Sequence, residues 1–134
     1  MIEEIKRDLY LIGANIQKQK PRSYHNDLQE EYCLLAQKYG FTSSKEFGMY
    51  KHTSGAYKGF IDVVWFQDDL PILAIEIDSS LRKRSFEKLI QFRGRSIWVY
   101  TGFEDVYDFL GQYGETMVGK VVLPSGRAVE IVVC

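Results

Sequence analysis

Long hydrophobic runs are missing from this sequence, and so is an excess of charge of either sign. No apolar stretch reaches the roughly 18 residues that a membrane-spanning helix needs, and the start of the chain, MIEEIKRDLY, is too charged for a signal peptide. The net charge is −1, so overall charge does not indicate nucleic-acid binding, which has to rest on local clusters. We therefore expect a cytoplasmic protein with no membrane partner.

Cysteine is scarce as well, with two residues in the whole chain. Cys33 lies in an apolar helical pattern and Cys134 is the last residue, so their spacing matches neither a metal site nor a disulfide framework. What the sequence does have is 46% apolar and 14% aromatic residues, which is typical of a globular domain. A chain of 134 residues predicts a single domain, 1–134, with a core of its own.

Two amphipathic helices are predicted at the start of the chain. Apolar residues recur at steps of three and four over residues 2–19, and Pro21 ends this pattern. A second helix is predicted over residues 24–39, with Gly40 as its stop.

The remaining chain predicts strands interrupted by helices. In order, these are strands 46–53, 60–67 and 72–78, helix 82–92, strand 96–101, helix 103–113 and a C-terminal hairpin over 116–133. Short turns join the first three strands, so they are expected to form an antiparallel meander. The helical crossover after them places strand 96–101 parallel to strand 72–78. The fold class is therefore α/β, with a mixed central sheet flanked by helices.

Three acidic residues stand out in the stretch FIDVVWFQDDLPILAIEID. With a turn over 68–71, Asp62 and Glu76 lie nearly the same distance from the centre of the hairpin, so they are opposite or nearly so. Asp78 is two residues beyond Glu76 and shares its face. The three carboxylates are thus expected to converge on one side of the sheet.

The surroundings of these acids are apolar on both faces of the two strands, which is typical of central, buried strands. Burying a lone carboxylate costs free energy, and clustering like charges costs more. A contribution to folding stability therefore does not explain the cluster, whereas a bound divalent cation does. Oxygen ligands suit Mg²⁺ or Mn²⁺. Asp62, Glu76 and Asp78 are therefore the predicted metal ligands; the alternative for Asp78 is that it only ends its strand.

These residues resemble the PD-(D/E)XK nuclease superfamily. GFIDVVW is similar to the family's strand with an aspartate, and AIEID to its (D/E)-x-K strand, with Glu76 in the acidic place. The resemblance covers residues 24–102 and implies a restriction-endonuclease-like three-layer sandwich and Mg²⁺-dependent hydrolysis of DNA. The helix 2–19 and the hairpin 116–133 are then additions to the family core. Because members of the family often cut two strands with paired sites, the resemblance also implies a homodimer.

The chain departs from the family pattern at Asp78, which stands in the place of the lysine. This E-x-D form is similar to that of very-short-patch-repair-like and Holliday-junction-resolvase-like endonucleases. A second metal, or a lysine supplied from elsewhere, would have to replace the lysine that orients the attacking water. The family also carries a helix acid, here Glu30 or Glu31; the helical wheel favours Glu31, and a solvated helix face is the alternative for both.

Basic residues near the predicted hairpins are candidates for contacts with DNA phosphates. Arg82 and Lys83 are predicted to project inward at the start of helix 82–92, and Arg84 and Lys88 outward. The alternative is a solvated basic face.

The turn SGAYKG contributes two further candidates. Lys58 shares the alternation of Asp62, and either His52 or Tyr50 falls on the same face, depending on the register. In the functional interpretation His52 acts as a general base. In the alternative interpretation it is a hairpin surface residue. His25 is expected to be a surface helix residue without a partner.

Three functions remain open at this stage. The first is an endonuclease, a hydrolase in which Asp62 and Glu76 hold the metal while Glu31 and Asp78 assist. The second is a module that kept the fold, lost hydrolysis, and binds nucleic acid or a protein partner. The third is a structural domain. The sequence does not indicate which DNA would be cut.

Overall fold

The computed structural model of the chain describes residues 1–19, 23–49 and 59–134. The helices are α1 (Ile2–Gln19), α2 (Tyr24–Leu35), the 3-10 helix η2 (Ala36–Tyr39), α4 (Lys83–Gln91) and α5 (Val106–Leu110). The strands are β1 (Thr42–Met49), β2 (Gly59–Gln67), β3 (Leu70–Asp78), β4 (Arg95–Tyr100), β5 (Glu115–Met117), β6 (Lys120–Val122) and β7 (Ala128–Val133). The predicted order of helices and strands is confirmed from α1 to α5.

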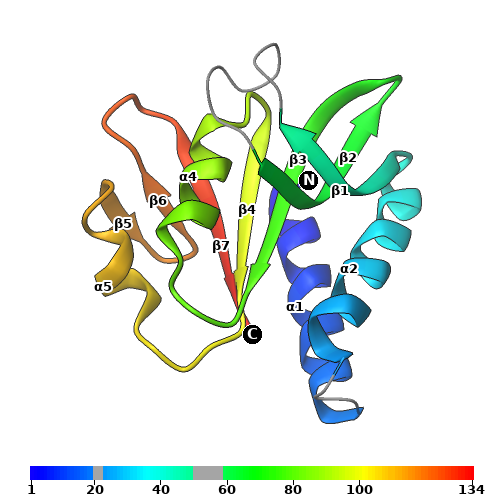
Figure 1. Ribbon diagram of the computed structural model, residues 1–134, viewed down its shortest axis with the longest axis horizontal. Coiled ribbons are helices and arrows are strands. Elements are labelled where there is room, and N and C mark those ends of the chain that lie inside the picture. Colours follow the sequence, from blue (N-terminus) through cyan, green and yellow to red (C-terminus); the bar gives the residue numbers. More distant parts are fainter. Residues whose placement is uncertain (20–22, 50–58) are drawn as a thin grey trace.

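A seven-stranded mixed sheet forms the centre of the molecule, in the order β1-β2-β3-β4-β7-β6-β5 (Figure 1). Strands β1, β2 and β3 form the predicted antiparallel meander, and β4 runs parallel to β3. Strand β7 then pairs with β4 in parallel, and β6 and β5 complete the edge. The α/β class is therefore confirmed, and the C-terminal hairpin is part of the same sheet.

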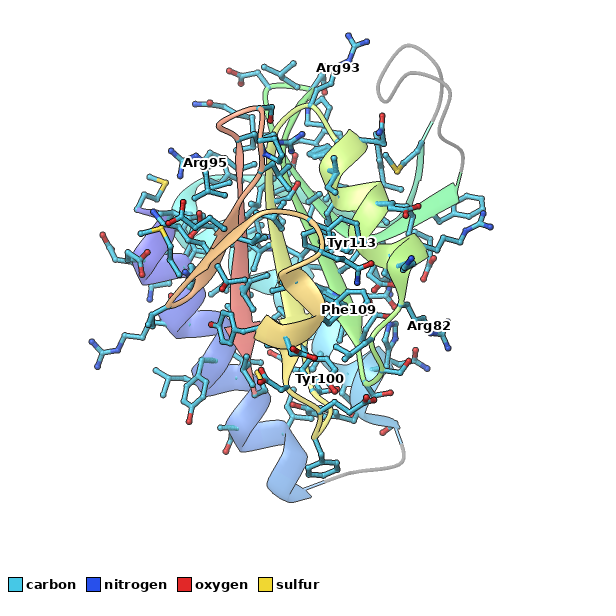
Figure 2. The ribbon with its side chains drawn as sticks, turned by 90° about the vertical axis from the view of Figure 1, so that its left-hand side faces the viewer. Arg82, Arg93, Arg95, Tyr100, Phe109 and Tyr113 are labelled. Carbon is cyan, nitrogen blue, oxygen red and sulfur yellow. The ribbon has the colours of Figure 1, made fainter. Side chains whose placement is uncertain are left out.

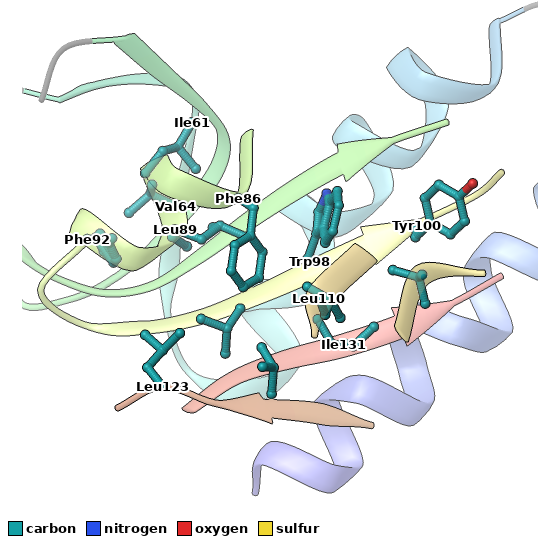
Figure 3. Close-up of a cluster of buried hydrophobic side chains, with 14 of the residues drawn as sticks. Ile61, Val64, Phe86, Leu89, Phe92, Trp98, Tyr100, Leu110, Leu123 and Ile131 are labelled. Atoms are coloured by element: carbon teal, nitrogen blue, oxygen red, sulfur yellow. The ribbon is translucent and has the colours of Figure 1, made fainter. Parts of the chain in front are cut away.

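Helices cover both faces of this sheet and bury two separate apolar clusters. On one face α1 and α2 pack over Val63, Trp65 and Ile75. On the other face α4 and α5 pack over Val64, Ala74 and Trp98, in the cluster drawn in Figure 3. Both tryptophans are fully buried, as expected of core residues.

Several sequence predictions are wrong in detail. The first arm of the hairpin predicted over 116–133 is divided by a turn into β5 and β6, and the helix predicted over 103–113 is confined to α5. Ile61 packs in the α4-side cluster, although regular alternation along β2 would place it with Val63 on the opposite face. The reason lies in the strand pairing around Asp62, where the regular ladder ends. The end of the strand predicted over 46–53 lies outside the described residues.

The hairpin between β2 and β3 contains a bulge that decides its register. Its turn consists of Asp68 and Asp69, both with positive φ, and is thus tighter than the predicted 68–71 turn. Near the turn Phe66 pairs with Pro71, but Trp65 pairs with Leu73, so β3 carries one extra residue. A one-residue slip exchanges the two faces of a strand, so this bulge sets which β3 residue comes opposite Asp62.

Candidate functional site

Strands β2 and β3 separate beyond the pair Val63 and Ile75, and carboxylates replace the missing ladder bonds. The Asp62 backbone N–H donates to Oε1 of Glu76 at 2.9 Å. In return the Ile77 backbone N–H donates to Oδ2 of Asp62 at 2.8 Å. The predicted proximity of Asp62 and Glu76 is thus present, and each side chain bonds to a backbone N–H that strand separation would leave unpaired.

Lys88 on α4 neutralises the more deeply buried of the two acids. Glu76 is 2% exposed, and its Oε2 lies 3.0 Å from Nζ of Lys88. Burial, and then the nearby charge of Asp62, raise the pKa of Glu76 to about 8, although Lys88 acts in the opposite direction. The pair therefore holds a carboxyl group that gains or loses its proton near neutral pH.

The outward orientation expected for Lys88 is wrong. Its side chain is 13% exposed, and Nζ also donates to the backbone oxygen of Phe60 at 2.6 Å. The long aliphatic stem allows the ammonium group to reach past the helix surface to the opened strands. Gly59 leaves room for this stem, since a Cβ there would lie 3.3 Å from Cδ of Lys88.

Asp78 lies on the same side of β3 as Glu76 but has its own partners. Nε1 of Trp98 donates to its Oδ2 at 2.8 Å, and Ser85 is the next polar side chain that stabilises the charged carboxylate. Burial raises the pKa of Asp78, while Trp98 and Ser85 act to lower it. Asp78 is also the last residue of β3, and its backbone oxygen accepts from the Thr101 N–H at 2.8 Å. Both readings of Asp78, as a site residue and as a strand end, are compatible with its position.

His25 reaches the site from α2, contrary to the expectation that it lacks a partner. Its Nε2 lies 3.3 Å from Oδ2 of Asp62. The hydrogen bond with Asp62 is the main reason why the pKa of His25 rises to about 9, so the imidazole is protonated at neutral pH. A sequence signal existed: His25 is three residues before Leu28 and seven before Tyr32, both on the buried face of the helix.

Gln29 is the second α2 residue that contacts this region. Its Nε2 donates to Oε1 of Glu46 and to the backbone oxygen of Asp62, both at 2.8 Å. Glu46 faces Asp62 across β1 and β2 and has a φ of 52°, which is rare for a non-glycine residue inside a strand. Sequence analysis considered neither residue.

The helix acids that sequence analysis proposed point elsewhere. Glu31 is exposed on α2, and Glu30 pairs with Lys45 at 2.6 Å. Gln29 and His25 are the α2 residues whose side chains approach Asp62. A catalytic role for Glu31 stays a prediction, with an exposed position that does not favour it.

The predicted phosphate-binding residues lie at the border of the site or outside the described chain. Arg82 and Lys83 are exposed at the start of α4, so the inward projection predicted for them is wrong; Nε of Arg82 is 3.3 Å from Oγ of Ser80. Figure 2 shows Arg82 projecting from the surface. Lys58 and His52 lie outside the described residues.

The side chains around Asp62 meet some of the requirements of a divalent cation. Within residues 1–19, 23–49 and 59–134, no group of three or more acidic, histidine or cysteine side chains is arranged to hold one. Two adjacent carboxylates are nevertheless present, and their repulsion contributes to the raised pKa of Glu76. Mg²⁺ is commonly held by one or two carboxylates together with water and substrate phosphates. The Asp62 and Glu76 pair fits this smaller requirement.

Comparisons of the chain with family models, with curated proteins and with solved structures found no match. Within the described part of the chain, no helix has both the length and the apolar character needed to cross a membrane.

Proposed function

We propose that this protein is a metal-dependent endodeoxyribonuclease whose site is the Asp62 and Glu76 pair with Lys88 beside it. The observation that carries the proposal is the contact between Nζ of Lys88 and Oε2 of Glu76 at 3.0 Å. The E-x-D motif lacks the lysine of the family it resembles, and this contact supplies a lysine from α4 to the same carboxylate. The proposal also draws support from the element order of helix, three-stranded meander, helix and parallel strand, which resembles the order expected for a restriction-endonuclease-like core.

Asp62 and Glu76 would hold Mg²⁺ or Mn²⁺, an ion that lowers the pKa of bound water and neutralises charge on the scissile phosphate. Lys88 provides a positive charge next to Glu76, where it orients the attacking water and attracts a phosphate oxygen. Protonated His25 adds a second positive charge beside Asp62 and is placed to donate a proton to the leaving oxygen. Gln29 holds the Asp62 backbone in place through its 2.8 Å hydrogen bond.

The test is cleavage of supercoiled plasmid DNA in Mg²⁺ or Mn²⁺, with EDTA as the metal-free arm. Asp62→Asn and Glu76→Gln are expected to abolish nicking while the circular dichroism spectrum stays unchanged. Asp108→Asn, an exposed aspartate on α5, is the matched control and is expected to cleave normally. Nicking that persists in EDTA or in the Asp62→Asn variant would overturn the proposal.

A module that binds DNA without cutting it is the second candidate. The observation that favours it is that Glu76, Asp62 and Asp78 each already have protein hydrogen-bond donors. In this case gel-shift assays with linear and branched DNA show binding that does not depend on the metal, and no product forms at high protein concentration. Size-exclusion chromatography with and without DNA tests the homodimer that the family resemblance implies.

A further inference from the structure

We propose that a depression where β3 and β4 begin binds a small ligand that carries a phosphate or carboxylate group on an apolar body. The depression has a volume of about 870 Å³ and is lined by residues 70–72, residues 92–96 and parts of the segment 127–130. Small-molecule sites typically enclose roughly 300–1,000 Å³. Glu76 and Asp78 lie toward the opposite ends of these strands, so this site does not depend on the proposed nuclease function.

Three arginines give the depression a positive charge. Arg93 and Arg95 are exposed at its rim, and within the described chain neither forms an ion pair with an acid. Figure 2 shows both at the end of the sheet opposite Tyr100. One acid, Glu130, is among the lining residues, but Lys6 neutralises it at 3.0 Å. The net charge facing a ligand is therefore positive.

Arg127 holds the third guanidinium group in a fixed orientation. NH1 donates to the backbone oxygen of Ile90 at 2.6 Å, and NH2 donates to that of Gly94 at 2.6 Å and to Oγ of Ser96 at 3.1 Å. These partners are neutral, and among the described residues no carboxylate pairs with Arg127. Its positive charge is thus uncompensated, and a preorganised guanidinium binds an oxyanion with little loss of conformational freedom.

Most of the remaining lining of the depression is apolar. Pro71, Ile72 and Phe92 contribute to the lining, next to the three arginines. An inorganic anion would leave this surface in water, whereas a ligand with an attached ring would cover it. The geometry therefore favours an oxyanion joined to an apolar group over a free anion.

Isothermal titration calorimetry and NMR titration in EDTA, which keeps the carboxylate pair free of metal, test this proposal. The probes are AMP, 1-naphthoate, adenosine and inorganic phosphate. We expect AMP, naphthoate or both to bind and to shift amide resonances of residues 92–96 and 127–130. Adenosine and inorganic phosphate should each bind at least about tenfold more weakly, because each lacks one of the two recognised features. Comparing AMP with naphthoate distinguishes a phosphate from a carboxylate ligand.

Charge reversal provides the decisive comparison. Arg95→Glu should weaken binding by about tenfold or more, since it removes one guanidinium and adds repulsion. Arg7→Glu, an exposed arginine on α1, is the matched control and should change the affinity by less than about twofold. Asp62→Asn should leave binding unchanged. The proposal is overturned if neither AMP nor naphthoate shifts these resonances at millimolar concentration, or if Arg95→Glu and Arg7→Glu weaken binding equally.

Discussion

The two ends of β3 and β4 hold charges of opposite sign, and the protein stabilises them in different ways. Where the strands begin, the half-buried Arg127 donates to backbone oxygens and to the Ser96 hydroxyl. Toward their other end, the buried Glu76 faces one flexible lysine, Lys88, at 3.0 Å. The oxygens around Arg127 belong to the fold and cannot leave, whereas an ammonium group can move away from a carboxylate. The charge of Arg127 is therefore held in place by the fold, whereas Glu76 and Lys88 are suited to exchanging partners.

The largest effect on the free energy of unfolding is expected at Arg127. Arg127→Met removes the N–H groups that donate to the end of α4 and to the loop before β4. The backbone oxygens of Ile90 and Gly94 then lose these hydrogen-bond donors. We expect the free energy of unfolding in urea to fall by about 3 kcal/mol. Arg93→Met, at the exposed rim, should change it by less than about 0.5 kcal/mol. Equal effects of the two substitutions would contradict the structural role of Arg127.

A somewhat smaller effect on the free energy of unfolding is expected at the pair formed by Lys88 and Glu76. Lys88→Met leaves the Glu76 carboxylate buried without a cation, so at pH 9 the free energy of unfolding should fall by about 2 kcal/mol. The double variant Lys88→Met with Glu76→Gln removes the uncompensated charge and should recover most of this loss. If the double variant is no more stable than Lys88→Met alone, the two side chains are not coupled.

The pH dependence of the free energy of unfolding should be set by two residues of the carboxylate site, Glu76 and His25. The pKa of Glu76 rises from 4.5 to about 8, so between these values the folded protein keeps a proton that the unfolded chain has released. The pKa of His25 rises from 6.5 to about 9, with the same consequence at higher pH. The free energy of unfolding should therefore fall as pH increases from 4.5 to 9, and each of the two protons contributes a slope of at most about 1.4 kcal/mol per pH unit within its own window.

Two variants separate these contributions in urea unfolding measured at a series of pH values. Glu76→Gln should flatten the lower part of the profile, between pH 4.5 and 8. His25→Asn should flatten the upper part, between pH 6.5 and 9, by a smaller amount because its side chain is 46% exposed and screened by solvent. Arg127→Met should leave the shape of the profile unchanged. A profile in which stability rises with pH over this range would contradict the assigned protonation states.

The smallest effect is expected in the turn that precedes β3. Asp69 has a φ of 59°, a conformation that glycine adopts without strain. Asp69→Gly should therefore raise the free energy of unfolding by about 0.5 kcal/mol, since Asp-Gly suits a two-residue turn of this type. Asp69→Ala should give no gain, because alanine is strained at the same φ. Such a pair of variants tests the hairpin register while leaving both charged ends intact.

Much of the fold followed from local patterns. Helical spacing predicted α1 and α2, and the short turns predicted the antiparallel meander that β1, β2 and β3 form. The length of the segment containing α4 predicted the parallel pairing of β3 with β4. Turn positions inside residues 103–123 were less accurate, because short strands and helices there depend on the sheet edge that they complete.

The carboxylate pair was predicted by counting across the hairpin, but the count succeeded only with the help of a bulge. The turn centre lies between Asp68 and Asp69, so a regular ladder would place Ile75 opposite Asp62. The extra residue in β3 moves Glu76 into that position instead. Nothing in the local sequence reveals the bulge, since it depends on how the two strands pack within the sheet.

The partners of the acids were beyond sequence reasoning. Lys88, His25 and Gln29 come from helices on the two opposite faces of the sheet, and they meet where β2 and β3 separate. Helical-wheel reasoning placed Lys88 in solvent because it considers the helix alone. Contacts over such sequence distances depend on the packing of whole elements against the sheet.

The sequence by itself determined the α/β class, the meander and the presence of buried acids, because the periodicity of apolar residues and the turn chemistry act locally along the chain. Tertiary structure alone decided the register that joins Asp62 to Glu76, the cation beside each of them, and the gathering of arginines at the other end of β3. These features bring together groups that are distant in the sequence, and only the packing of helices against a twisted, bulged sheet fixes the distances between them.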